Sequence, residues 1–178
     1  MVAIAIPARV RWAVDVLAPV AGERILDIGS GTGASVELIV ETVGGGGTVV
    51  AIDRSASAVG RIRNRVERAI DDGIVDVIES SVADIDTARG PFDAAIALNV
   101  NVFWTTDAAA DLVALSRVMA PGARLVIAYG DGPAPGLDRG HLDLVHSNVD
   151  ASPWFDVQRR VDHEHASALV AITTAHPS

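Results

Sequence analysis

Short apolar runs alternate along the chain with longer segments in which apolar residues recur at helical spacing. The apolar runs predict buried strands at residues 24–28, 48–52, 74–79, 92–98 and 123–129. The run at residues 92–98 is apolar at nearly every position, as expected for a strand that is covered on both faces. This alternation predicts a layered α/β fold.

The intervening segments each carry an apolar stripe, which predicts amphipathic helices. These helices are expected at residues 8–17, 34–43, 55–70, 105–119 and 137–148. Ser55 or Ser57 is the expected cap of the third helix. Thr105 or Thr106 is the expected cap of the fourth.

Two of the predicted helices leave an alternative open. The first is expected to pack at the sheet edge, but it could instead carry Trp12 as a lid over a bound cofactor. The third carries a row of arginines, Arg61, Arg63, Arg65 and Arg68, which are expected to face solvent. The alternative for this row is an anion-binding surface.

The last strands are expected near residues 154–161 and 168–174, with too few residues between them for a crossover helix. They therefore predict an antiparallel hairpin at the sheet edge. The fold class is α/β, a doubly wound sheet with helices on both faces. We expect one domain, with an N-terminal helix and linker at residues 1–23 and a Rossmann-like core at residues 24–174.

Composition excludes several functions. The chain of 178 residues has no cysteine, which excludes disulfides, thiolate zinc sites and cysteine nucleophiles. All fourteen basic residues are arginine, so Schiff-base chemistry and lysine-dependent phosphate loops are excluded as well. The net charge of −9 argues against nucleic-acid binding. Without a long apolar span or a secretory leader, we expect a soluble cytoplasmic protein with no membrane partner.

Three glycines directly follow the predicted strand at residues 24–28. Gly29, Gly31 and Gly33 suit a tight turn that brings bare backbone against a ligand. Asp53 ends the next strand, and a carboxylate there can accept hydrogen bonds from both hydroxyls of a ribose. Strand, turn and helix together predict a site for a nucleotide-type cofactor.

The identity of this cofactor depends on Asp27. Gly29, Gly31 and Ala34 formally satisfy the dinucleotide pattern, so a nicotinamide-dependent oxidoreductase is one alternative. Asp27 lies two residues before the first glycine, where it would repel a pyrophosphate. It suits instead a ligand that carries an ammonium and a sulfonium, as S-adenosyl-L-methionine does.

At these residues the chain resembles the class I S-adenosylmethionine-dependent methyltransferases. The matching segments are Leu-Asp-Ile-Gly-Ser-Gly-Thr-Gly at 26–33, Ile-Asp at 52–53, residues 92–99, and residues 115–126 with their Met-Ala-Pro-Gly turn. The resemblance implies a methyltransferase with a seven-stranded, mostly parallel sheet of order 3-2-1-4-5-7-6 and an antiparallel last strand. It also implies that the cofactor is held by Asp27, Gly29, Ser30, Gly31, Gly33, Asp53, Arg54 and Asn99.

The resemblance weakens at the adenine. Family members commonly have an Asp after strand three, and this position falls on Ser81 here. We expect Ser81 and the backbone N–H of Val82 to contact adenine, with Asp84 as the alternative if the loop is shifted.

Methyl transfer by in-line displacement depends mainly on positioning, so no catalytic residue is assigned. His141, Asn99 and Tyr129 are weak candidates for a general base, although His141 is also expected as a surface or capping residue. The His-x-His at 163–165 is expected to be a solvated turn, and no metal is expected.

Residues 99–104 resemble the Asn-Val-aromatic run of small-molecule methyltransferases, which implies a small-molecule methyl acceptor. The acceptor-recognition elements of such enzymes are brief here. The acceptor pocket is therefore small, open, or completed by a second subunit in a homodimer. The functional alternative is a non-catalytic S-adenosylmethionine-binding protein or partner subunit.

Overall fold

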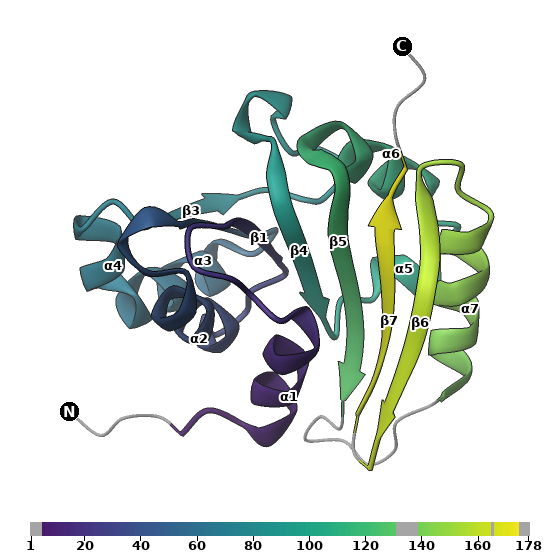
Figure 1. Ribbon diagram of the computed structural model, residues 1–178. Coiled ribbons are helices and arrows are strands. Elements are labelled where there is room, and N and C mark those ends of the chain that lie inside the picture. The colour runs from purple at the N-terminus through teal and green to yellow at the C-terminus, as the bar shows by residue number, and fades with distance from the viewer. Residues whose placement is uncertain (1–4, 131–138, 165, 175–178) are drawn as a thin grey trace.

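A seven-stranded sheet runs through the part of the chain described by the computed structural model, residues 5–130, 139–164 and 166–174 (Figure 1). The strands are β1 (Arg24–Ile28), β2 (Thr48–Asp53), β3 (Val75–Glu79), β4 (Phe92–Leu98), β5 (Met119–Gly130), β6 (Phe155–His163) and β7 (Ala166–Thr173). Their order is β3-β2-β1-β4-β5-β7-β6. The strands β3, β2, β1, β4 and β5 pair in parallel, whereas β7 is antiparallel to both β5 and β6. The predicted fold class, strand order and edge hairpin are confirmed.

Helices cover both faces of the sheet. One face carries α1 (Ala8–Leu17), α2 (Ala34–Val43), α3 (Ala56–Arg65) and α4 (Glu67–Asp71), with the 3-10 turn η1 (Gly44–Gly46) after α2. The other carries α5 (Val102–Thr105), α6 (Ala109–Val118) and α7 (Arg139–Asp150), and the 3-10 turn η2 (Thr87–Arg89) contacts α6. Within the described residues no helix is both long and apolar enough to cross a membrane.

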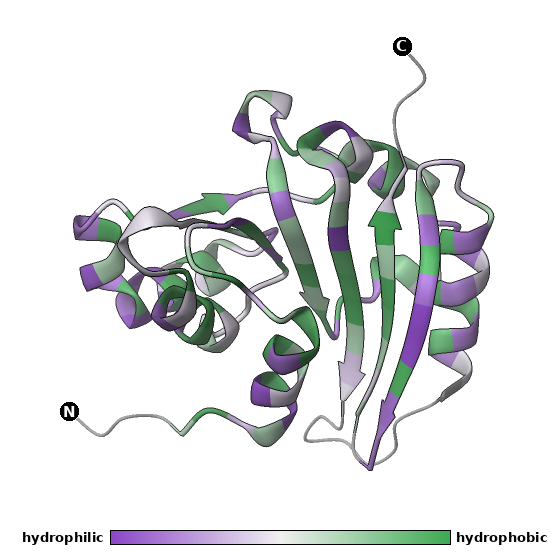
Figure 2. Ribbon diagram, in the orientation of Figure 1, coloured by the Kyte–Doolittle hydropathy of each residue, from purple (hydrophilic) through white to green (hydrophobic). Residues whose placement is uncertain are grey.

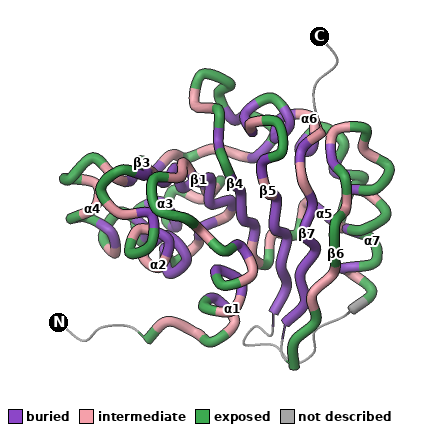
Figure 3. The backbone as a smooth tube through the Cα atoms, viewed as in Figure 1, coloured by how far each residue is buried: buried purple, intermediate pink, exposed green. Residues whose placement is uncertain are grey.

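Two hydrophobic cores lie on the two faces of the sheet. Ile25 and Val49 belong to the core under α1 to α3, whereas their neighbours Leu26 and Val50 belong to the core under α5 to α7. Because successive strand residues point to opposite faces, strands that are covered on both sides are apolar at almost every position. Figures 2 and 3 show this for β7, which is apolar and buried along its length, and the contrast with the polar edge strand β6.

Helix α1 packs on a face of the sheet rather than at its edge. It contacts β4, β5 and β7 and buries Val10, Ala13, Val14 and Leu17. The Trp12 ring lies against His163, with ring centroids 5.7 Å apart, so it is not placed as a lid over a cofactor.

Arg124 of β5 joins the end of α1 to the sheet. Its guanidinium donates to the Leu17 carbonyl at 3.2 Å and to both carboxylate oxygens of Glu23 at 2.9 Å. Since Glu23 directly precedes β1, this ion pair fixes the entry of the chain into the central strand.

The helix predicted at residues 55–70 is broken. Ser55 caps its start, accepting from the Ala58 N–H at 3.4 Å, but α3 ends before Val66 and a short α4 follows. The prediction that the arginine row faces solvent is wrong at Arg65. Its side chain is only 15% exposed, because its guanidinium forms an ion pair with Glu37 of α2 at 2.5 Å.

The helix predicted at residues 105–119 begins later than expected. Thr105 ends the separate helix α5, and Ala108 adopts a left-handed conformation before α6 begins. The predicted caps are wrong, since Thr106 Oγ1 accepts from the Ala108 N–H within the intervening turn at 3.0 Å.

The remaining boundaries differ by a few residues. Strand β5 begins at Met119, and its register against β4 shifts where Pro121 and Gly122 interrupt the pairing. Helix α7 begins at Arg139, and the start predicted at residues 137–138 lies outside the described residues.

Candidate functional site

The glycine turn after β1 is tied to the end of β2. Gly29, Gly31 and Gly33 have φ values of 64°, 56° and 75°, a region that glycine adopts without steric cost. The N–H groups of Gly29 and Ser30 donate to the Ile52 carbonyl at 2.8 and 3.2 Å. These contacts hold the predicted cofactor turn against the neighbouring strand.

A cleft of about 550 Å³ opens where the parallel strands end. Gly29 follows β1, Asp53 ends β2, and Asn99 follows β4. Arg54, Ser81 and Val82 complete the predicted residues that line it, and the further lining residues are Ile28, Ile52, Ser80, Val100, Asn101, Val102, Thr105, Thr106 and Asp111. The structure therefore gathers residues from distant parts of the sequence in one cleft, at the sheet edge where doubly wound folds bind ligands.

The other predicted cofactor residues lie in or beside the turn without lining the cleft. Asp27 and Ser30 are buried, and Ser30 Oγ donates to the Asp27 carbonyl at 2.9 Å. Gly33 caps α2 and donates its N–H to the Ser30 carbonyl at 2.8 Å. Gly31 donates its N–H to Asp53 Oδ2 at 3.0 Å. These residues shape the turn from within.

Gly29 leaves no room for a side chain. A Cβ built there would lie 2.7 Å from Val100 Cγ2, across the cleft lining. We expect Gly29→Ala to lower the free energy of unfolding by about 2 kcal/mol, through this overlap and the positive φ. Gly22→Ala is the matched control, since Gly22 also has a positive φ of 87° but nothing within 4 Å of its Cβ position. Equal losses in urea unfolding of the two variants would contradict the packing argument.

The Asp53 carboxylate, predicted to bind a ribose, is held by two backbone N–H groups. Its Oδ2 accepts from the Gly31 N–H and its Oδ1 from the Ser55 N–H, both at 3.0 Å. A carboxylate oxygen has two acceptor positions, so each can still accept from a ligand hydroxyl. The carboxylate is thereby oriented before any ligand binds.

Asp27 carries a carboxylate oxygen without a partner. The residue is 2% exposed, and Oδ2 has no hydrogen-bond partner within the described chain. Burial raises the pKa of Asp27 to about 6, and the Ser35 and Ser30 hydroxyls near the carboxylate oppose this shift. An unsatisfied buried carboxylate is costly unless a cation pairs with it. The site therefore fits a ligand ammonium at the end of β1.

Ser81 and Asp84, the alternatives for adenine, contact each other. Ser81 Oγ donates to Asp84 Oδ2 at 2.6 Å. Ser81 and the buried Val82 line the cleft, whereas Asp84 does not. This geometry favours Ser81 and Val82 over Asp84, and their contact with adenine stays a prediction.

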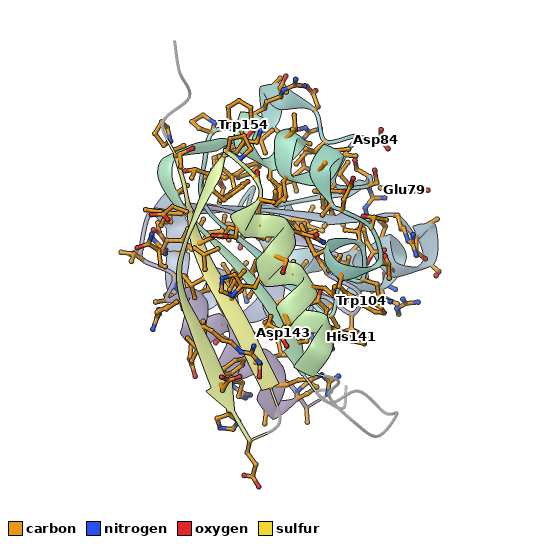
Figure 4. All side chains as sticks on the ribbon, turned by 90° about the vertical axis from the view of Figure 1, so that its right-hand side faces the viewer. Glu79, Asp84, Trp104, His141, Asp143 and Trp154 are labelled. Carbon is orange, nitrogen blue, oxygen red and sulfur yellow. The ribbon has the colours of Figure 1, made fainter. Side chains whose placement is uncertain are left out.

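Each weak candidate for a general base already has a structural contact. Asn99, with a φ of 59°, accepts the Gly130 N–H through Oδ1 at 2.9 Å. The Tyr129 hydroxyl donates to the Val100 carbonyl at 2.6 Å, and burial raises the pKa of Tyr129 above its usual value. The His141 ring stacks on the Trp104 ring, with ring centroids 3.7 Å apart. The two side chains lie near the start of α7 (Figure 4). Of the three, only Asn99 lines the cleft.

Tyr129 is expected to act by positioning. Because its hydroxyl holds the Val100 carbonyl, Tyr129→Phe should cost about 1 kcal/mol of stability. If the chain catalyses the methyl transfer that its sequence resemblance implies, this variant should slow it by less than about tenfold, whereas loss of a general base costs about a hundredfold or more. The comparison requires unfolding curves and single-turnover rates, and a hundredfold loss of rate would identify Tyr129 as a base.

The sequence pattern did not identify Asp111 as a site residue. Asp111 is 8% exposed and lines the cleft, since α6 begins only at Ala109. The signal that could have identified it is an acidic residue within the apolar stripe of the predicted helix at residues 105–119. The described residues contain no group of three or more metal-ligating side chains, and His163 ends β6 while His165 lies outside the described residues.

Fold and cleft together define a class of protein, a doubly wound domain for a cationic nucleoside cofactor. Comparisons with known proteins agree with this class. A profile described as a methyltransferase domain matches residues 25–122. The chain therefore belongs to the class I S-adenosylmethionine-dependent methyltransferases, and its cofactor is S-adenosylmethionine.

Two curated relatives are quinone methyltransferases by name. The demethylmenaquinone methyltransferase of Clavibacter sepedonicus is 31% identical over 85% of this chain and 65% of its own length. The ubiquinone/menaquinone biosynthesis C-methyltransferase of Methylococcus capsulatus is 31% identical over 66% of this chain and 47% of its own length. The chain thus spans about half to two thirds of these relatives.

A crystal structure of an S-adenosylmethionine-dependent methyltransferase from Aquifex aeolicus has the same fold. Its TM-score is 0.76, at 20% identity, over 93% of this chain and 89% of the other.

Proposed function

We propose that the chain is a single methyltransferase domain that transfers a methyl group from S-adenosylmethionine to a small-molecule acceptor by in-line displacement. The observation that carries the proposal is one cleft that joins the Gly29 turn, Asp53 and the segment at residues 99–106. When bound, the cofactor supplies a methyl group on a sulfonium, so the leaving group needs no proton.

In this proposal the chain contributes mainly orientation. Asp27 pairs with the ligand ammonium, and Asp53 accepts from the ribose hydroxyls. Gly29, Ser30, Gly31 and Gly33 supply the turn, and Arg54, Ser81, Val82 and Asn99 line or border the nucleoside. Catalysis by positioning is consistent with the occupied contacts of Asn99, Tyr129 and His141.

The acceptor side of the cleft suits a small planar molecule. Val100 and Val102 offer apolar surface there, and Asn101, Thr105 and Thr106 offer amide and hydroxyl groups. No ionisable side chain lies among residues 99–106. Together with the names of the curated relatives, this supports a reduced quinone as the first acceptor class to be tested.

The alternative is a protein that binds S-adenosylmethionine without turnover, or a partner subunit. Two observations favour it. Of the three base candidates only Asn99 lines the cleft, where its Oδ1 accepts the Gly130 N–H, and the chain spans only part of its curated relatives. The leading proposal includes a homodimer that completes the acceptor pocket. It also includes a cytoplasmic location.

Product analysis distinguishes these functions. The protein would be incubated with S-adenosylmethionine and reduced naphthoquinone, reduced benzoquinone or catechol, and S-adenosylhomocysteine would be quantified by mass spectrometry. We expect acceptor-dependent product with the wild type and much less with Asp53→Ala at the same subsaturating cofactor concentration. Cofactor binding by calorimetry without product from any acceptor would support the non-catalytic alternative.

A further inference from the structure

A second acidic side chain lies in the cleft beside Asp53, and the proposed function does not use it. Asp111 belongs to the first turn of α6 and is 8% exposed. It lines the same cleft as Ser80, Ser81 and Val82, which follow β3. The cleft thus has an acid on the β2 side and another on the α6 side.

Asp111 is held in place by backbone groups. Its carboxyl accepts hydrogen bonds from its own N–H and from the N–H of Ala83. Burial, and to a smaller extent the nearby Asp107 and Asp84, raise its pKa. Since both charged neighbours are acidic, the carboxylate is stabilised by hydrogen-bond donors rather than by a cation.

Adenine offers the donor that such a carboxylate can accept. Its amino group is a hydrogen-bond donor, and the adjacent ring nitrogen is an acceptor that suits a backbone N–H. Val82 can supply this N–H, and Asp111 is joined to the same loop through Ala83. The Ser81 hydroxyl, which donates its proton to Asp84, can also accept from the amino group, but it is neutral and so a weaker acceptor than a carboxylate.

We propose that Asp111 accepts a hydrogen bond from the adenine amino group and so selects adenine over other bases. This proposal rests on the binding of S-adenosylmethionine in the cleft. It gives α6 a role in cofactor specificity, through a residue that follows β4 rather than β3 along the chain.

A carboxylate in the first turn of a helix also stabilises the helix through its dipole, and the test must separate the two roles. The probes are S-adenosylhomocysteine and S-inosylhomocysteine, in which a carbonyl oxygen replaces the amino group and the adjacent ring nitrogen carries a proton. The readout is the ratio of their dissociation constants by calorimetry, which a purely structural role does not change.

The wild type should prefer the adenine compound by about a hundredfold. Asp111→Asn should reduce this ratio by about tenfold or more, because the amide can donate to the oxygen of the inosine base. Asp107→Asn is the matched control, an exposed acid near Asp111 that does not line the cleft, and it should leave the ratio unchanged. If Asn disturbs folding, Asp111→Ser removes the carboxylate with a side chain that helix starts tolerate.

An unchanged ratio in folded Asp111→Asn or Asp111→Ser would overturn the role of Asp111. So would a ratio that collapses in Ser81→Ala instead, since that result would assign the amino group to Ser81. A wild type that binds neither compound would overturn the cofactor site and the proposed function together. The two kinds of failure are therefore distinguishable.

Discussion

Asp53→Ala should weaken the binding of S-adenosylhomocysteine by about a hundredfold or more. Hydrogen bonds to a charged group contribute about 1.5–3 kcal/mol each, and a ribose offers two hydroxyls to this carboxylate. The loss should be large because Asp53 is already oriented by the N–H groups of Gly31 and Ser55, so little conformational freedom is lost on binding. Calorimetric titration of both proteins measures the effect.

The same two backbone contacts require a control for stability. Asp53→Ala removes the acceptor for the Gly31 N–H, so thermal unfolding must show that the variant is folded at the titration temperature. Asp72→Ala removes a carboxylate that is 58% exposed and should bind like the wild type. A folded Asp53→Ala protein with nearly wild-type affinity would remove Asp53 from the cofactor site.

The affinity for S-adenosylhomocysteine should rise with pH near the pKa of Asp27. Burial raises this pKa to about 6, and only the ionised carboxylate attracts the ligand ammonium. Affinity should therefore increase about tenfold between about pH 5 and about pH 7. Asp27→Asn should bind weakly and without this pH dependence, as calorimetry at several pH values would show.

The stability of the ligand-free protein should change in the opposite direction. The pKa of Asp27 is raised from 3.8 in a solvated chain to about 6 in the fold, so between these values the folded state holds more protons. The Asp27 contribution is fully present below about pH 4 and falls by about 3 kcal/mol as pH rises through about 6. Asp27→Asn should lose this part of the pH dependence, whereas the exposed Asp15→Asn should keep it. If the stability and the ligand affinity of the wild type both rose with pH near pH 6, the role assigned to Asp27 would be contradicted.

The sheet and the cofactor turn could be predicted because their determinants are local. Strands covered on both faces must be apolar at both odd and even positions, because successive side chains point to opposite faces. The left-handed turn after β1 requires glycines. The helix breaks could not be predicted in this way. Neither Val66 nor Ala108 is a glycine, proline or asparagine, so the sequence gives no local signal for the break, although Arg65 beside Val66 pairs with Glu37 and Ala108 donates its N–H to Thr106 Oγ1.

The misplaced start of α6 had a consequence for the site. A helix that begins at residue 105 would place Asp111 in its middle and make Thr105 or Thr106 its cap. In the structure the same three residues line the cleft. The residues of the proposed acceptor side could not be predicted, because their position follows from the left-handed conformation of Ala108, which the sequence pattern does not indicate. Asp53 and Gly29 could be predicted, because they lie at strand ends that the pattern does indicate.

Two hydrogen bonds join the residues that follow β4 to the end of β5, and they bear on how the cleft could change in evolution. Asn99 accepts the Gly130 N–H, and the Tyr129 hydroxyl donates to the Val100 carbonyl, so the wall at residues 99–106 is anchored to β5 as well as packed against Gly29 through Val100. Substitutions at Asn101, Val102 or Thr105 can then alter the shape of the acceptor surface while the nucleoside half keeps its own supports. Asn101, Val102 and Thr105 are therefore the positions at which the cleft can change shape without a change at Gly29, Asp53 or Asn99.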